Sequence, residues 1–277
     1  MTKRQFVEKY KRISLQEKLN LEKTFIRDLK LYFNMLSKSL RSGKGFISIE
    51  DTLSKHYARV IKKVTEKHPK KAKSEGNFLW KILHFLDDYI KKLLASHSKI
   101  IDDNSKVDIQ KAVDIANDDK TGTPKGLLVA RIFKNISMGR ISGISITETS
   151  QLYEKSRAMV VNTVHEEMVT AINDGDQEYI DELAEYGEDY TSQEIADDSR
   201  KGVPSAALIL ALDNSTKQWQ TQGDSKVRIA HQEADGQEVG INDFYMVMGQ
   251  MLMYPGDSSM GASASNVCNC RCSSVYL

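Results

Sequence analysis

Apolar residues recur at helical spacing through most of the first 175 positions of the chain. The first predicted helix begins at a capping box formed by Ser14 and Glu17 and ends at Gly43. Its apolar stripe comprises Leu15, Leu19, Ile26, Leu29, Phe33, Leu36 and Leu40. The same period predicts two further amphipathic helices, over residues 48–68 and 77–101, with lysines on their other faces.

The middle of the chain keeps the helical period but contains glycines. The pattern predicts a short helix over residues 106–118 and a longer helical segment over residues 126–174. Because Gly139 and Gly143 interrupt the longer segment, we expect two or three helices joined by tight turns there.

Short alternating runs and turn signals replace these stripes near the C-terminus. Residues 217–222 alternate as a strand, Asp235-Gly236 is a hairpin dipeptide, and a long apolar run closes at Pro255-Gly256. The methionines of that run are expected in the core, namely Met246, Met248, Met251 and Met253. These signals predict a small β-containing unit.

The sequence therefore predicts an α+β protein with four parts. The expected boundaries give a basic helical region over 1–103, a helical middle region over 104–175, an acidic connector over 176–203 and a C-terminal domain over 204–277.

The formal net charge of +1 conceals a strong asymmetry along the chain. Residues 1–100 contain 24 Lys and Arg against 10 Asp and Glu, a net charge of +14, whereas residues 161–277 contain 6 against 20, a net charge of −14. This separation indicates either a nucleic acid or another acidic partner at the basic end, or attraction between the two ends. Candidate nucleic-acid contacts are Lys62, Lys63, Lys67, Lys70, Lys71 and Lys73.

No apolar stretch approaches the ~20 residues that a spanning helix needs, so we expect neither export nor membrane insertion. The three cysteines, Cys268, Cys270 and Cys272, lie within five positions and cannot form a disulfide framework between distant segments. Folding in a reducing cytoplasm is the expectation.

Polar and aromatic residues of the C-terminal region follow one another in a specific order and spacing. We call them the signature residues: Trp219, Asp224, Arg228, His231, Asp235, Gly236, Pro255, Gly256, Asn269, Cys270, Arg271 and Cys272. This series, with Val227 and Phe244, resembles the C-terminal signature of the phage Mu F-like minor head proteins, the phage head morphogenesis family. Residues 204–277 carry most of the resemblance, residues 125–175 carry part of it, and residues 1–100 carry none.

The helix upstream departs from the family pattern, because Asn162, Thr163 and Val164 stand where members usually have Arg-Thr-Glu. The resemblance implies a minor capsid or head morphogenesis protein that associates with the portal or the inner capsid and acts in head assembly, DNA packaging or genome delivery. No catalytic residue can be carried over from the family, and we expect neither enzymatic activity nor a cofactor. The expected location is the virion, in the head interior or at the portal vertex, after assembly in the host cytoplasm.

Read from the residues alone, the region has a structural interpretation. Arg228, His231, Asp235 and Asp257 would form an internal ionic and hydrogen-bond cluster that fixes the C-terminal tail, while the cysteines pack in reduced form. A metal-dependent nuclease, with His231 as base and Asp235 or Asp257 as ligands, is a second interpretation.

A zinc site formed by His231, Cys268, Cys270 and Cys272 is a third interpretation. Alternate cysteines in an extended strand would lie in a row about 6–7 Å apart, and structural zinc sites typically have longer spacers. Packing is therefore favoured over metal binding by the spacing.

Overall fold

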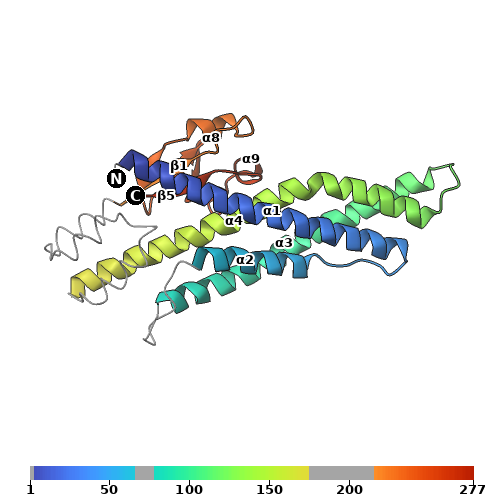
Figure 1. The fold of residues 1–277 in the computed structure, drawn as a ribbon, viewed down its shortest axis with the longest axis horizontal. Helices are drawn as coiled ribbons and strands as arrows, with labels where there is room; N and C mark the ends of the chain where they lie inside the picture. The colour runs from blue at the N-terminus through green and yellow to red at the C-terminus, as the bar shows by residue number, and fades with distance from the viewer. Residues whose placement is uncertain (1–2, 66–77, 175–214) are drawn as a thin grey trace.

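Four helices and a small β-containing domain make up the described part of the protein (Figure 1). The computed structural model describes residues 3–65, 78–174 and 215–277. The helices, which we call the helical stem, are α1 (Lys3–Arg41), α2 (Glu50–Thr65), α3 (Phe78–Asn117) and α4 (Lys125–Asp174). The α+β class predicted from the sequence is confirmed.

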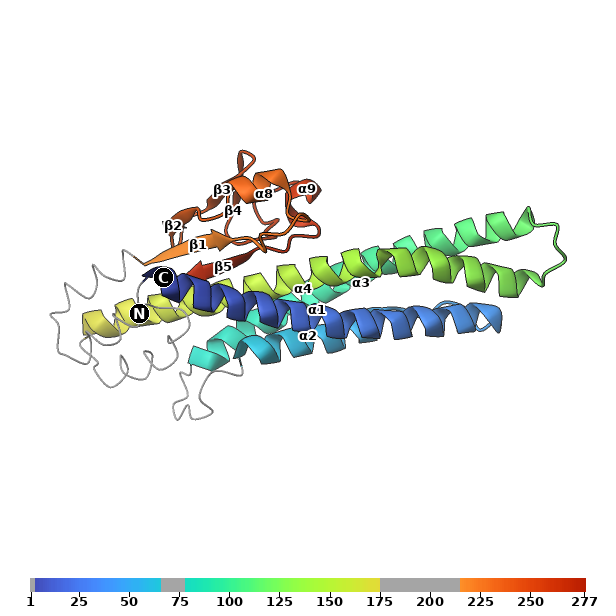
Figure 2. The same ribbon diagram turned by 45° about the horizontal axis from the view of Figure 1, so that its top comes forward.

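The helical stem is elongated and has α4 at its centre. With 50 residues, α4 extends for about 75 Å, and it packs against α1, α2 and α3 (Figures 1 and 2). The core of the stem is apolar and aromatic, and its fully buried members include Phe25, Leu29, Leu36, Leu53, Tyr57, Phe133 and Leu152. Among the described helices, none has a stretch long and apolar enough to span a membrane.

Helix α1 begins eleven residues before the predicted capping box, at Lys3. Ser14 lies inside the helix, where its Oγ donates to the backbone oxygen of Lys11 at 3.2 Å. The prediction of a helix start at Ser14 was therefore wrong. The preceding residues include neither Gly nor Pro and are mostly Lys, Arg, Gln and Glu, which favour helix continuation.

Helix α4 runs without a break through Gly139 and Gly143, so the prediction of two or three helices was wrong. A glycine inside a helix costs only about 1 kcal/mol, which packing along both sides of α4 outweighs. Likewise, α3 joins the two helices predicted over 77–101 and 106–118 and continues across the boundary expected at residue 103.

Residues 215–277 form the C-terminal domain. Strands β1 (Thr216–Gln220), β2 (Glu238–Gly240) and β5 (Ser273–Tyr276) make an antiparallel sheet in the order β2-β1-β5. A hairpin of β3 (Tyr245–Val247) and β4 (Gln250–Leu252) and two short helices, α8 (Ile229–Glu233) and α9 (Ala264–Val267), complete it. The domain lies along one side of the stem, with β5 next to α1 (Figure 2).

Two turns of the domain differ from the prediction. Asp235-Gly236 connects α8 to β2 and so does not form a hairpin, because Gly236, with φ 80°, terminates the helix as left-handed glycines commonly do. The hairpin turn is instead Met248-Gly249, where both residues have positive φ, 51° and 69°.

The β3–β4 hairpin exposes most of the methionines that were expected in the core. Met246, Met248 and Met251 are 50 %, 67 % and 43 % exposed, so the core assignment was wrong for these three. Strand alternation explains the difference, because the inward positions of the hairpin are taken by Tyr245, Val247 and Leu252.

Candidate functional site

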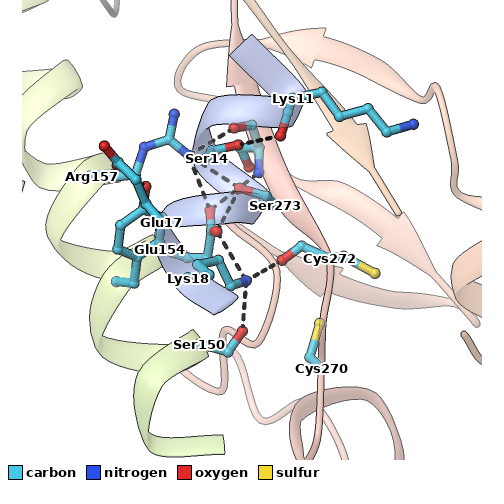
Figure 3. Close-up of polar contacts among 12 residues, drawn as sticks. Lys11, Ser14, Glu17, Lys18, Ser150, Glu154, Arg157, Cys270, Cys272 and Ser273 are labelled. Atoms are coloured by element: carbon cyan, nitrogen blue, oxygen red, sulfur yellow. Dashed lines mark hydrogen bonds and ion pairs between the residues drawn. The ribbon is translucent and has the colours of Figure 1, made fainter. Parts of the chain in front are cut away.

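A buried polar interface joins the C-terminal domain to the helical stem (Figure 3). We call it the polar latch and define it by Lys18 of α1, Ser150, Glu154 and Arg157 of α4, and Ser273 of β5. The Lys18 Nζ lies 3.1 Å from Oε1 of Glu154 and donates to Ser150 Oγ at 3.1 Å. It also donates to the backbone oxygen of Cys272, as Figure 3 shows.

The carboxylate of Glu154 also accepts hydrogen bonds from strand β5. Ser273 Oγ donates to Oε1 of Glu154 at 2.7 Å, and the backbone NH of Ser274 donates to Oε2 at 3.2 Å. From the next turn of α4, Arg157 donates to Ser273 Oγ at 3.1 Å and to the backbone oxygen of Ser274 at 3.0 Å. The final strand of the domain is thus bonded to α4 through both its side chains and its backbone.

The sequence of α1 explains where the latch forms. Ser14, Lys18 and Glu22 occupy the same buried stripe that continues as Phe25 and Leu29, so its first turns are polar and the later ones apolar. Burial raises the pKa of Glu22, while the charge of Lys18 opposes that rise. The apolar part of this stripe packs in the core of the stem, and its polar part faces the C-terminal domain.

A second buried group lies inside the C-terminal domain. We call it the Cys–His cluster and define it as His231, Cys270 and Cys272, whose ligand atoms all lie within 4.8 Å of one another. The Nδ1 atom of His231 is 3.8 Å from Cys270 Sγ and 3.5 Å from Cys272 Sγ. All three side chains are at most 2 % exposed.

The two thiols of the cluster have different acidities. A hydrogen bond from Cys272 favours the thiolate of Cys270 and lowers the pKa of Cys270, and the nearby His231 and Lys18 act in the same direction. The same bond, together with burial, raises the pKa of Cys272.

The third cysteine, Cys268, is half-buried and lies outside the cluster. The chain turns between it and Cys270, because Asn269 has a left-handed φ of 56° and its NH donates to Thr147 Oγ1 of α4 at 3.0 Å. Arg228 donates to the backbone oxygen of Cys268 and fixes the tail at this point. The structure thus groups three of the four ligands considered for zinc.

The carboxylates of the C-terminal region fix loops. Asp224 pairs with Arg271 at 2.6 Å, and Asp235 Oδ1 accepts from the NH of Thr221 at 2.7 Å. Asp257, which is buried, accepts from the backbone NH groups of two residues of its own loop, Met253 and Ser259, each at 2.9 Å.

The residues considered for a nuclease are therefore not assembled. Within residues 3–65, 78–174 and 215–277, neither Asp235 nor Asp257 belongs to a group of potential metal ligands with His231. The ionic cluster expected from Arg228, His231, Asp235 and Asp257 is not formed as one group. Arg228 donates to the backbone of the C-terminal tail, whereas Asp235 and Asp257 each accept hydrogen bonds in a separate turn.

The remaining signature residues shape the core of the domain. Trp219 is fully buried and meets His231 and Tyr245 edge-on, with ring centroids 5.5 Å and 5.2 Å apart. Pro255 is buried in the turn that it forms with Gly256. At Gly256, with φ 86°, a Cβ atom would lie 3.7 Å from Ser150 Oγ of α4 and 3.9 Å from Cys270 Cβ.

The candidate nucleic-acid contacts are only partly described. Lys62 is exposed at the end of α2, and Lys63 Nζ lies 3.8 Å from Glu17 Oε1. The other four lysines and the acidic connector over 176–203 lie outside the described residues. The latch residues Lys18, Glu154 and Arg157 were missed from the sequence, although a lysine on the buried stripe of α1 is a signal that points to them.

Comparison with known proteins finds no family model that matches the chain and no significantly similar curated protein or solved structure.

Proposed function

We propose that this chain is a minor capsid or head morphogenesis protein of a tailed bacteriophage, with a structural role at the portal or in the head interior. The observation that carries the proposal is the placement of the signature residues. Arg228, Arg271 and Asn269 fix the C-terminal tail, Trp219 and His231 lie in the core, and Gly256 lies against α4. Such contacts support a role in closing and docking the C-terminal domain.

The end of the helical stem remote from the C-terminal domain has features that favour binding of another protein. Large apolar side chains are exposed on the second half of α1, on the segment that joins α1 to α2, on the C-terminal part of α3 and at the start of α4. These segments lie at the end of the stem remote from the C-terminal domain (Figure 1). The exposed side chains are Leu31, Met35, Phe46, Ile47, Val107, Ile115 and Leu127. Apolar groups gathered on one end of an elongated protein favour contact with another protein. In the proposed function, that partner is the portal protein or the inner capsid.

The experiment that tests this function is co-expression with the portal protein encoded by the same genome, followed by co-purification. We expect the wild-type chain to co-purify, and a Leu31→Glu/Met35→Glu variant to lose the portal. Met248→Glu, which alters an exposed methionine of the C-terminal domain, is the matched control and keeps the portal. Co-expression with the capsid protein is the second arm of the experiment, and failure of the wild-type chain to bind either protein would contradict the proposal.

DNA binding through the basic N-terminal region is the second candidate, favoured by the net charge of +14 over residues 1–100. Part of this charge is neutralised inside the fold, because the buried Lys18 pairs with Glu154, which lies outside residues 1–100. If the rest contacts phosphates, full-length protein should bind duplex DNA with an affinity that falls steeply as salt rises. Binding that is independent of salt, or no binding at low salt, would exclude this candidate.

A further inference from the structure

We propose that His231, Cys270 and Cys272 bind one zinc ion inside the C-terminal domain. The inference concerns the Cys–His cluster alone and stands independently of the proposed function. Its starting point is that one imidazole nitrogen and two sulfur atoms, all buried, lie within 4.8 Å of one another.

The distances within the cluster match the needs of a tetrahedral ion. Zinc binds sulfur at about 2.3 Å and nitrogen at about 2.0 Å, so a tetrahedral site places these ligand atoms about 3.5 Å apart. The observed separations of His231 Nδ1 from the two sulfurs are 3.5 Å and 3.8 Å. All three ligand atoms lie within 4.8 Å of one another, so only small movements of the side chains are needed to bring them to bonding distance of one ion.

The orientation of the imidazole agrees with this assignment. Its Nδ1 faces both sulfurs, whereas its Nε2 is buried and has no hydrogen-bond partner among the described residues. The ring is thus placed by its contacts with the sulfurs and by Trp219, which meets it edge-on. Binding of zinc through Nδ1 uses the side of the ring that the fold already points at the thiols.

The spacing of the cysteines at alternate positions was expected to keep their side chains too far apart for one ion. The backbone conformation of the tail shows why this expectation does not hold. Strand β5 begins only at Ser273, so Cys270 and Cys272 precede it and do not lie along a flat strand. The left-handed Asn269 turns the chain immediately before them. Both sulfurs can therefore face His231, and the separation of about 6–7 Å expected for an extended strand does not apply.

The sulfur and nitrogen ligands of the Cys–His cluster favour zinc over other common metal ions. Two thiolates and an imidazole suit zinc, whereas magnesium and calcium require oxygen ligands. The described residues supply three ligands, and a small ligand such as water takes the fourth position. Cys268 is excluded from the ligand set because it lies outside the cluster.

Zinc at this position would connect three segments of the chain. His231 belongs to α8, the two cysteines belong to the C-terminal tail, and the backbone oxygen of Cys272 accepts from Lys18 of α1. The apolar core of the domain is small, with Trp219, Tyr245, Val247 and Leu252 as its largest buried members. Small domains commonly need such a metal for stability.

The test is metal analysis of the full-length protein produced in zinc-supplemented medium and separated from free metal. We expect about one zinc per chain in the wild-type protein and loss of zinc in Cys270→Ser and Cys272→Ser. Cys268→Ser is the matched control, because it removes the neighbouring thiol outside the cluster, and it should keep the zinc. Absence of zinc from the wild-type protein would overturn the proposal, and loss of zinc in Cys268→Ser would overturn the assigned ligand set.

X-ray absorption of the wild-type protein keeps the test decisive if the cysteine variants fail to fold. The expected spectrum has two sulfur neighbours at about 2.3 Å and nitrogen or oxygen neighbours at about 2.0 Å from zinc. A shell of nitrogen and oxygen only would show that any bound zinc lies elsewhere, and would contradict the proposal.

Discussion

Lys18 and Glu154, which are 136 residues apart in the sequence, form an ion pair of 3.1 Å that is buried between the helical stem and the C-terminal domain. Both side chains are almost inaccessible, with exposures of 1 % and 0 %. Because a buried charge without its partner is strongly destabilising, this pair links the folding of the domain to that of α1 and α4.

Replacement of Lys18 tests this link. Lys18→Met removes the closer of the two cations beside Glu154 and leaves Arg157 at 3.8 Å, so we expect the free energy of unfolding to fall by about 3 kcal/mol, the lower end of the cost of breaking a buried pair. Urea denaturation followed by circular dichroism measures the change.

The matched control is Lys55→Met in α2. It breaks a Lys–Asp pair of 2.6 Å in which both side chains are exposed, and the cost should stay below about 0.5 kcal/mol. Equal effects of the two substitutions would show that the buried pair does not carry the connection.

His56 gives the stem a specific dependence on pH. The ring stacks on Phe25 with centroids 3.8 Å apart and contacts Thr149 Oγ1 through Nε2 at 3.0 Å. Burial, with a smaller effect of Arg59, lowers the pKa of His56 from 6.5 to about 3. The unfolded chain therefore binds a proton near pH 6.5 that the folded chain accepts only near pH 3, and stability is lost as the pH falls through this window.

From this shift we expect the contribution of His56 to make the protein about 2 kcal/mol less stable at pH 5 than at pH 8. Since carboxylates also titrate in this range, the measurement is the difference between wild-type protein and His56→Gln, each unfolded with urea at both pH values. The wild-type protein should lose more stability than the variant. Identical losses would mean that His56 is protonated in the folded state.

The two glycines of α4 provide a matched pair of substitutions. A Cβ atom at Gly139 would have no neighbour within 4 Å, so Gly139→Ala should stabilise the protein by about 1 kcal/mol through helix propensity. At Gly143 the same atom would lie 3.2 Å from Oδ1 of Asn269. We expect Gly143→Ala to give a smaller gain or a loss, because the side chain of Asn269 must shift to make room for the added methyl group.

Thermal unfolding of the two variants checks this expectation. If both alanines raised the melting temperature equally, the close approach of Asn269 to α4 would be incorrect.

The helical period predicted the helices but misplaced their ends. Gly139 and Gly143 are strong local signals for a turn, yet α4 continues through them because α1 and α3 pack along its sides. The cost of a glycine is local and small, whereas the stabilising contacts come from residues far away in the sequence. Sequence periodicity does not contain these contacts.

The candidate site was predictable in its parts but not in its assembly. His231, Cys270 and Cys272 were recognised as potential ligands, and their regular spacing wrongly indicated an extended strand. The left-handed conformation of Asn269 decides the geometry, and it depends on a contact with Thr147 of α4. The polar latch was missed because the pairing of Lys18 with Glu154 depends on the packing of α1 against α4, which the sequence pattern does not contain.

The proposed structural role in a phage head is tested most directly by the protein composition of purified proheads and virions. If the chain has this role, quantitative mass spectrometry of particles from the corresponding phage should detect it, at far fewer copies than the major shell protein. Its absence from purified particles at every stage of assembly would contradict the account.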